Sequence, residues 1–273
     1  MTAHGASREA LAAARERVDA LTDSTSVDAG RLADELAAVT ALLDREVSLR
    51  RVLTDPAQAG EAKAELVQRL LAGQVGGEAT DLLSGMVRSR WSQSRDLVDA
   101  LEELANIADF TAAQRSGTLD DVEDELFRFA RIVSSSIGLR AALTDRKATT
   151  SAKSELLRSL LGGRAAVVTE RLVTRLVTAP RGRSLEAGLE SLSRLAAERR
   201  DRTVAVVTSA VPLSDPQKQR LGAALAKLYG RRMHLNLDVD PEVVGGIRVR
   251  VGDELINGSI ADRIEDAGRR MAS

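Results

Sequence analysis

The feature that most constrains this chain is an internal repeat, because segments 90 residues apart share residues that helical periodicity does not require. The pattern Leu-Arg-x-x-Leu-Thr-Asp at 49–55 recurs at 139–145. Between 49–73 and 139–163, 12 of 25 positions are identical, whereas composition alone gives about two or three. Amphipathic helices resemble one another at apolar positions, but not at Thr-Asp, Lys and Gly. The repeat therefore indicates a duplicated structural unit.

Most of the first 200 residues place Leu, Val and Ala at the three- and four-residue spacing of amphipathic helices. Glycines, Asp55-Pro56 and Pro180 interrupt this spacing and predict helix ends. The expected helices are Ser7–Leu21, Arg31–Leu53, Gly60–Leu71, Glu78–Trp91, Arg95–Phe110, Leu119–Leu143, Ser151–Leu161, Ala166–Thr178 and Ser184–Arg200.

The pattern changes near Arg202, where β-branched residues begin to alternate with other residues. Strands are expected at 203–211, 233–239, 247–251 and 255–256, with one helix opening at Asp215-Pro216 and a last one at Ser259. The sequence thus predicts a mainly α protein. A helical bundle with an internal duplication is followed by a small α+β domain of order β-α-β-β-β-α. The expected parts are 1–110, 111–201 and 202–273.

Composition excludes several classes of function. With 39 basic and 40 acidic residues the chain is near neutral, which argues against a general nucleic-acid clamp. It contains no cysteine, and hence no disulfide, thiolate ligand or thiol nucleophile. No apolar run approaches the roughly 18 residues of a membrane span. The N-terminus lacks the pattern of a secretory signal, which predicts a cytosolic protein.

The sequence also lacks clusters of residues that could form a catalytic or metal-binding site. His4 and His234 are the only histidines, and they cannot assemble a catalytic set or a zinc site. The spacing of Asp238, Asp240 and Glu242 suggests a calcium loop, but Val243 and Val249 occupy positions where such a loop needs Gly and Glu. The sequence therefore predicts no cofactor, no metal and no catalysis. A helical array with shallow apolar stripes is typical of an interaction protein.

The C-terminal part carries a specific resemblance. The segments Thr208-Ser-Ala-Val-Pro-Leu-Ser214, 235–253 and Asn257-Gly-Ser-Ile-Ala-Asp-Arg-Ile264 resemble the delta subunit family of bacterial F-type ATP synthases, which includes the oligomycin-sensitivity conferral protein. The family's signature falls on Asp240, Val244, Gly245, Gly246, Ile247, Val249, Gly252 and Asp253. A following Gly-Ser and helix fall on Gly258, Ser259 and Arg263.

This resemblance implies a non-catalytic stator subunit. The helical part would bind the alpha and beta subunits of the catalytic head, and the C-terminal domain would hold the b-type peripheral stalk. No nucleic acid would bind, and membrane association would come only through the complex. The expected place is the cytoplasmic face of the bacterial plasma membrane.

The duplication departs from the family's single helical domain, and residues 1–110 are the expected full equivalent of that domain. The second copy lacks an obvious opening helix, because 111–117 is short and polar. We therefore expect the head to dock on the first copy, in a groove between two stripes. The alternative, of equal weight, is that the stripes pack against each other in the core. The stripe residues are Ala10, Leu11, Ala14, Val18, Leu97, Leu101 and Leu104.

Two other classes of function are weaker. An RNA-binding protein could use Gly245-Gly246 as a backbone-approach loop beside Arg248 and Arg250. However, a KH-type loop needs Gly-x-x-Gly between two helices, and no aromatic stacking residue lies nearby. An enzyme is weaker still, because the sequence offers no nucleophile, metal set or phosphate cradle.

Overall fold

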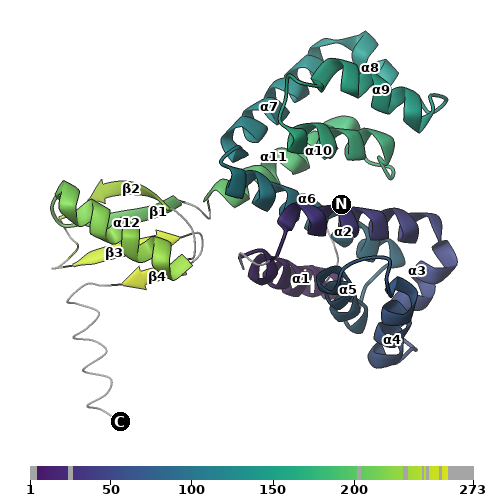
Figure 1. The fold of residues 1–273 in the computed structure, drawn as a ribbon, viewed down its shortest axis with the longest axis horizontal. Coiled ribbons are helices and arrows are strands. Elements are labelled where there is room, and N and C mark those ends of the chain that lie inside the picture. Colours follow the sequence, from purple (N-terminus) through teal and green to yellow (C-terminus); the bar gives the residue numbers. More distant parts are fainter. Residues whose placement is uncertain are drawn as a thin grey trace. The chain divides into compact units, whose positions relative to one another are not determined.

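The fold was analysed in a computed structural model that describes residues 5–23, 27–201, 204–229, 233–241, 243, 246–251 and 254–257. The chain divides into two compact units, Met1–Ala196 and Ala197–Ser273 (Figure 1). The first unit is helical. Its elements are α1 (Gly5–Asp23), α2 (Ala29–Arg45), α3 (Val47–Thr54), α4 (Gly60–Leu71), α5 (Gly77–Arg88), α6 (Ser94–Ser116), α7 (Leu119–Ser135), α8 (Ile137–Thr144), α9 (Thr150–Leu161) and α10 (Val167–Thr178). Helix α11 (Leu185–Asp201) begins in this unit and ends in the second one.

The duplication is visible in the helix bounds. Helices α2, α3, α4 and α5 recur as α7, α8, α9 and α10, each with both ends displaced by 90 residues. Two separate hydrophobic clusters fill the unit, one around Leu36 and Leu82 and the other around Leu126 and Leu172. Each copy therefore has its own core.

One repeated motif explains part of the sequence match. Glu125 on α7 accepts hydrogen bonds from the backbone N–H of Ala166, at 3.0 and 3.1 Å, and from the Thr169 hydroxyl. It therefore satisfies free donors at the start of α10. Its counterpart Glu35 lies beside Gly76 at the start of α5, where an added Cβ would be 2.9 Å from the carboxylate. The repeated Asp-Glu-Leu thus joins the second and fifth helices of each copy.

Two expected helices are each divided in the structure. The segments 31–53 and 119–143 were expected to be continuous, but the backbone leaves the helical conformation at Glu46 and Ser136. At Ser136 the hydroxyl accepts a hydrogen bond from the backbone N–H of Leu139 and starts a new helix. The break redirects α3 and α8, so that Leu53 and Leu143 reach the two cores.

The expected end of the helix that begins near Arg95 is also wrong. The sequence predicted a helix ending at Phe110, but α6 continues to Ser116 and ends at Gly117, whose φ of 74° suits glycine. Its earlier residues, such as Leu97 and Leu101, belong to the first core, while Phe110 and Ala113 belong to the second. A shift of 90 residues from α1 (Gly5–Asp23) falls on positions 95–113, inside α6. One helix therefore closes the first copy and opens the second, which has an opening helix after all.

The second unit holds a four-stranded sheet with the order β2-β1-β3-β4. Strand β1 (Val204–Ser209) pairs in parallel with β2 (His234–Val239) and antiparallel with β3 (Ile247–Val251), which pairs antiparallel with β4 (Glu254–Asn257). Helix α12 (Asp215–Tyr229) connects β1 to β2 and lies across one face of the sheet (Figure 1). A small core forms from Ala205, Val207, Leu225, Val249 and Val251. The mainly α architecture with a small α+β part is confirmed, while the expected last helix lies outside the described residues.

Candidate functional site: an ionic seam on the shared helix

The stripes expected to form a docking groove are in the core instead. Ala10, Ala14 and Val18 on α1 are buried, as are Leu97, Leu101 and Leu104 on α6, and all six belong to one hydrophobic cluster. Leu11 is half-buried against the same cluster. The expectation of an open groove between them is therefore wrong for this state, because the small residues of α1 let the two helices close on each other.

Polar contacts hold the same pair of helices together. The buried hydroxyl of Ser7 donates to the Asp96 carboxylate at 2.6 Å and accepts from the backbone N–H of Ser92 at 2.8 Å. Arg15 on α1 forms an ion pair with Glu103 on α6. These bonds fix the α1–α6 contact near the start and the middle of α1, so a partner helix could not enter between the two helices there without breaking them.

The most concentrated set of charges lies on the other side of α6, where it meets α10 and the turn at 180–183. Asp109, whose side chain has no exposed surface, forms ion pairs with Arg171 at 2.8 Å and with Arg175 at 2.9 Å. Arg175 also donates to the Asn106 side-chain oxygen at 2.8 Å. Arg171 reaches Asp34 on α2 at 3.2 Å. These contacts connect the second copy to both α6 and the first copy.

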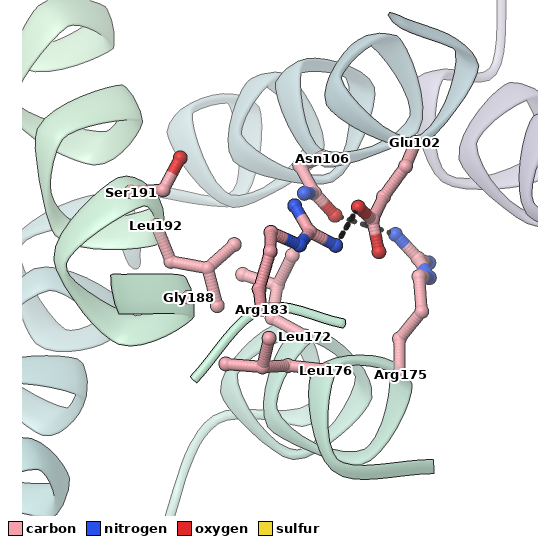
Figure 2. Close-up of a pocket in the computed structure, with 9 residues that line it drawn as sticks. All are labelled: Glu102, Asn106, Leu172, Arg175, Leu176, Arg183, Gly188, Ser191 and Leu192. Atoms are coloured by element: carbon pink, nitrogen blue, oxygen red, sulfur yellow. Dashed lines mark hydrogen bonds and ion pairs between the residues drawn. The ribbon is translucent and has the colours of Figure 1, made fainter. Parts of the chain in front are cut away.

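Two turns before Asp109 on α6, the buried Glu102 receives two more arginines. Arg181 and Arg183 both form ion pairs with its carboxylate, and Arg181 also lies 3.6 Å from Asp99. Figure 2 shows Arg183 and Glu102 pointing toward one another, with Arg175 beside Asn106. Leu172, Leu176 and Leu192 line the same small polar pocket. We call the whole arrangement of Asp99, Glu102, Asn106 and Asp109 with Arg171, Arg175, Arg181 and Arg183 the ionic seam.

The backbone conformation of the turn at 180–183 directs Arg181 and Arg183 toward α6. Arg181 has a φ of 46° and Gly182 a φ of 79°, and the backbone N–H of Arg183 donates to the Pro180 carbonyl at 3.0 Å. Positive φ is costly for a residue with a side chain. The strain at Arg181 places its guanidinium, which is 4% exposed, against the α6 carboxylates.

Burial raises the pKa of two carboxyl groups in the seam. It raises the pKa of Asp109 above the ordinary value, and the ion pairs with Arg175 and Arg171 oppose the rise. Burial likewise raises the pKa of Asp99, against the influence of Arg181 and Arg183. For these two carboxyl groups, desolvation outweighs pairing.

The ionic seam is better suited to holding helices together than to catalysing a reaction. It contains no nucleophile with an adjacent base, and in the part of the chain that the structure describes no three acidic, His or Cys side chains gather as metal ligands would. None of the described helices is long and apolar enough to span a membrane. The carboxylates are already paired with arginines, so they hold helices together.

Sequence reasoning missed the seam, because its partners lie about 60–80 residues apart and nothing local marks them. The only local signals were Glu102, Asn106 and Asp109 at helical spacing on α6, where the buried face carries acids among leucines. Trp91 packs in the first core, with its indole N–H donating to the Met86 carbonyl at 2.8 Å. It is a packing residue.

The signature of the second unit is described only in part. Ile247, Val249 and Val251 lie on the inner side of β3, while Arg248 and Arg250 are exposed, which confirms the alternation. Asp240 donates its backbone N–H to the Ser209 carbonyl at 3.0 Å and joins the ends of β1 and β2. Gly246 occupies a bend before β3. The other signature positions, Val244, Gly245, Gly252, Asp253, Gly258, Ser259 and Arg263, lie outside the described residues.

Comparison with known families matches part of the chain to one model. The model described as ATP synthase delta (OSCP) subunit matches residues 107–271. The match begins within α6 and continues through the second copy and the second unit. The matched residues therefore include the second copy and the second unit, while residues 1–106 lie outside the match. That residues 1–110 are the family's full equivalent stays a prediction.

Curated relatives extend the similarity to the whole chain. The protein named ATP synthase subunit delta of Streptomyces avermitilis is 82% identical over 100% of both chains. That of Streptomyces coelicolor is 83% identical over 99% of this chain and 98% of the relative. That of Kineococcus radiotolerans is 47% identical over 98% and 97%. These relatives therefore share the first copy as well as the second.

Among solved structures, a chain of the Toxoplasma gondii mitochondrial ATP synthase hexamer is matched at 18% identity, over 62% of this chain and 95% of that chain. Its TM-score of 0.34 is too low to compare the arrangement of the helices.

Proposed function

Because the chain belongs to the ATP synthase delta (OSCP) subunit family, a family of non-catalytic subunits, we propose that it is a stator of a proton-translocating F-type ATP synthase. In this role it links the alpha/beta catalytic head to the membrane-anchored b subunits and resists the torque of the rotor. It turns over no substrate. It joins the cytoplasmic face of the bacterial plasma membrane only as part of the complex.

The observation that carries this proposal is the shared helix with its ionic seam. A stator must transmit force without bending, and a single 23-residue helix runs through both helical copies. On one side it is held by a leucine core, and on the other four arginines of the second copy reach its carboxylates and amide. Such many-membered contacts favour one rigid arm over two jointed domains.

The division of labour follows the parts 1–110, 111–201 and 202–273, with α6 bridging the first two. Residues 107–271 are those the family model matches, so the second copy and the small α+β part perform the shared task. The helical part contacts the alpha and beta subunits, and the α+β part holds the b-type subunits. The first copy, fastened to α6, extends the arm.

The test is to purify the full-length tagged chain from detergent-solubilised membranes of its own cells. Recovery of alpha, beta and b-type subunits is expected, together with loss of coupling between ATP hydrolysis and proton pumping in membranes depleted of the chain. The purified chain alone should hydrolyse no ATP. Recovery of ribosomes or RNA instead of these subunits would contradict the proposal.

A further inference from the structure

The ionic seam leaves buried hydrogen-bond donors without an acceptor. Among the described residues, the Nε of Arg183 and the Nε of Arg181 are buried and have no hydrogen-bond partner. Asn106 adds another donor. Arg175 donates to its side-chain oxygen at 2.8 Å, so its amide nitrogen points the other way, toward the Arg183 guanidinium (Figure 2). Where the chain supplies no acceptor to a buried donor, a water molecule or an ion normally does.

Charge is also unbalanced in the seam. It contains four arginines and three carboxylates, so one positive charge has no counterpart within it. Two residues at its edge leave this balance unchanged, because Arg95 contacts the Arg181 carbonyl and Asp34 pairs with Arg171. An uncompensated charge is costly among buried side chains. An anion would therefore be a better acceptor here than a water molecule.

A small cavity lies where these donors meet. Asn106, Arg175 and Arg183 line it together with leucines of α10 and α11 (Figure 2). The Glu102 carboxylate also reaches the cavity, but it already pairs with Arg181 and Arg183. The cavity volume of about 10 Å³ admits about one water-sized species, which excludes phosphate, sulfate and organic acids. Arg183 is 31% exposed, so its side chain can adjust to an ion slightly larger than water.

From this arrangement we propose that the cavity binds one small monovalent anion, for which chloride is the probe. The anion accepts hydrogen bonds from Arg183 and Asn106 and neutralises the excess charge, while the leucines form its apolar wall. Because these donors belong to α6 and to the turn at 180–183, and Arg175 lies on α10, the anion holds the second copy against α6. Without it, this contact opens more often.

The anion site is a property of the chain by itself. Its test therefore uses the purified full-length protein and does not depend on the proposed function, which co-purification of the ATP synthase subunits tests separately.

Hydrogen exchange of the α10 amides, followed by mass spectrometry, is compared in sodium chloride and in sodium gluconate at equal ionic strength. Exchange through local opening should be about tenfold slower in chloride at ten times its dissociation constant, since bound ligand suppresses opening in proportion. Gluconate is too large for the cavity. Equal exchange in the two salts would mean that a water molecule fills the cavity, and would overturn the proposal. Equal slowing by sulfate would overturn it as well, since a general salt effect would then explain the result.

Asn106→Asp identifies the site. The substituted side chain keeps an oxygen for Arg175 but replaces the amide donor by a carboxylate, which supplies the missing negative charge. Exchange of α10 in this variant should no longer respond to chloride. The matched control is Gln68→Glu, the same change of amide to acid at an exposed position of α4, which should respond as the parent does. An undiminished chloride response in Asn106→Asp would place the anion elsewhere and overturn the proposal.

A direct measurement of binding accompanies the exchange experiment. The line width of the chloride-35 magnetic resonance signal should increase when the parent or Gln68→Glu is added, and should increase several-fold less with Asn106→Asp. Arg183→Gln, which removes both a donor and the excess charge, should also lose the broadening once its melting shows that it is folded. Equal broadening by all four proteins would contradict a site in the seam.

Discussion

The two helical copies have the same helix bounds but are held together differently. In the first copy, α1 and α6 close over a leucine core, and Arg88 on α5 forms an ion pair with Glu61 on α4. In the second copy, the counterparts of Arg88 and Glu61 are Thr178 and Ser151, and only Leu143 and Leu157 are buried in α8 and α9. The ionic seam attaches it to α6, together with the apolar contacts of Phe110 and Ala113. Duplication thus preserved the backbone, while the side chains at the contacts diverged.

The largest expected effect comes from breaking the seam at its most buried carboxylate. Asp109→Ala leaves Arg171 and Arg175 without their shared partner, which should destabilise the second copy by about 3 kcal/mol. Hydrogen exchange of α10 amides, followed by mass spectrometry, measures the loss. The matched control is Asp19→Ala, 90 residues earlier on α1, where the half-buried side chain should cost less than about 1 kcal/mol. Equal costs at the two positions would mean that the seam is no more important than an ordinary helix contact.

The second prediction tests whether the contact between α1 and α6 is part of the hydrophobic core or forms a docking groove. Ala14→Glu forces a charge into the contact between α1 and α6, where Ala14 is 5% exposed, and should destabilise the first copy by about 2 kcal/mol. Ala13→Glu, on the exposed side of α1, is the control and should be nearly neutral. The measurement is urea unfolding followed by the fluorescence of Trp91, which lies in this core. A stable Ala14→Glu variant that loses only its binding partner would restore the groove that the sequence suggested.

Local sequence patterns predicted most of the helices and strands, but not how far α6 extends or which residues join one helix to another. The sequence predicts the helix ends at Gly117 and Gly163 and the alternation of buried and exposed residues in β3. These features depend on residues only a few positions apart. The continuation of α6 past Phe110 was not readable, since Thr111, Gln114 and Arg115 look like a polar loop. Those residues are helical because Phe110 and Ala113 pack into the second core. Likewise, Asp109 finds Arg171 and Arg175 only in three dimensions, so no spacing rule could identify the seam.

The third prediction uses the raised pKa of Asp109. A carboxyl group whose pKa is higher in the folded state than in the unfolded state binds protons more tightly when folded. Its burial therefore destabilises the fold at neutral pH, and this penalty is lost as pH falls through the raised pKa toward the ordinary value of 3.8.

The difference in unfolding free energy between the parent and Asp109→Asn should accordingly shift in favour of the parent as pH is lowered through that window. Its slope is at most about 1.4 kcal/mol per pH unit. Urea unfolding of both proteins at several pH values measures it. The same slope with the opposite sign would show that pairing with Arg171 and Arg175 outweighs desolvation.

The smallest effect is expected from giving the second copy the surface ion pair of the first. Glu61 accepts two hydrogen bonds from Arg88, at 2.9 and 3.0 Å, and Ser151→Glu with Thr178→Arg places the same pair between α9 and α10. Ser151 is exposed and Thr178 is half-buried, so the pair stays largely hydrated and should slow hydrogen exchange in α9 by only about twofold. Each single substitution should do nothing, and the gain should vanish at high salt, where exposed charges are screened. A gain that persists in salt would come from added packing by the longer side chains. In that case α8 and α9 differ from α3 and α4 mainly in their smaller number of buried residues, such as Ala64 replaced by Ser154, and less in the missing charge pair.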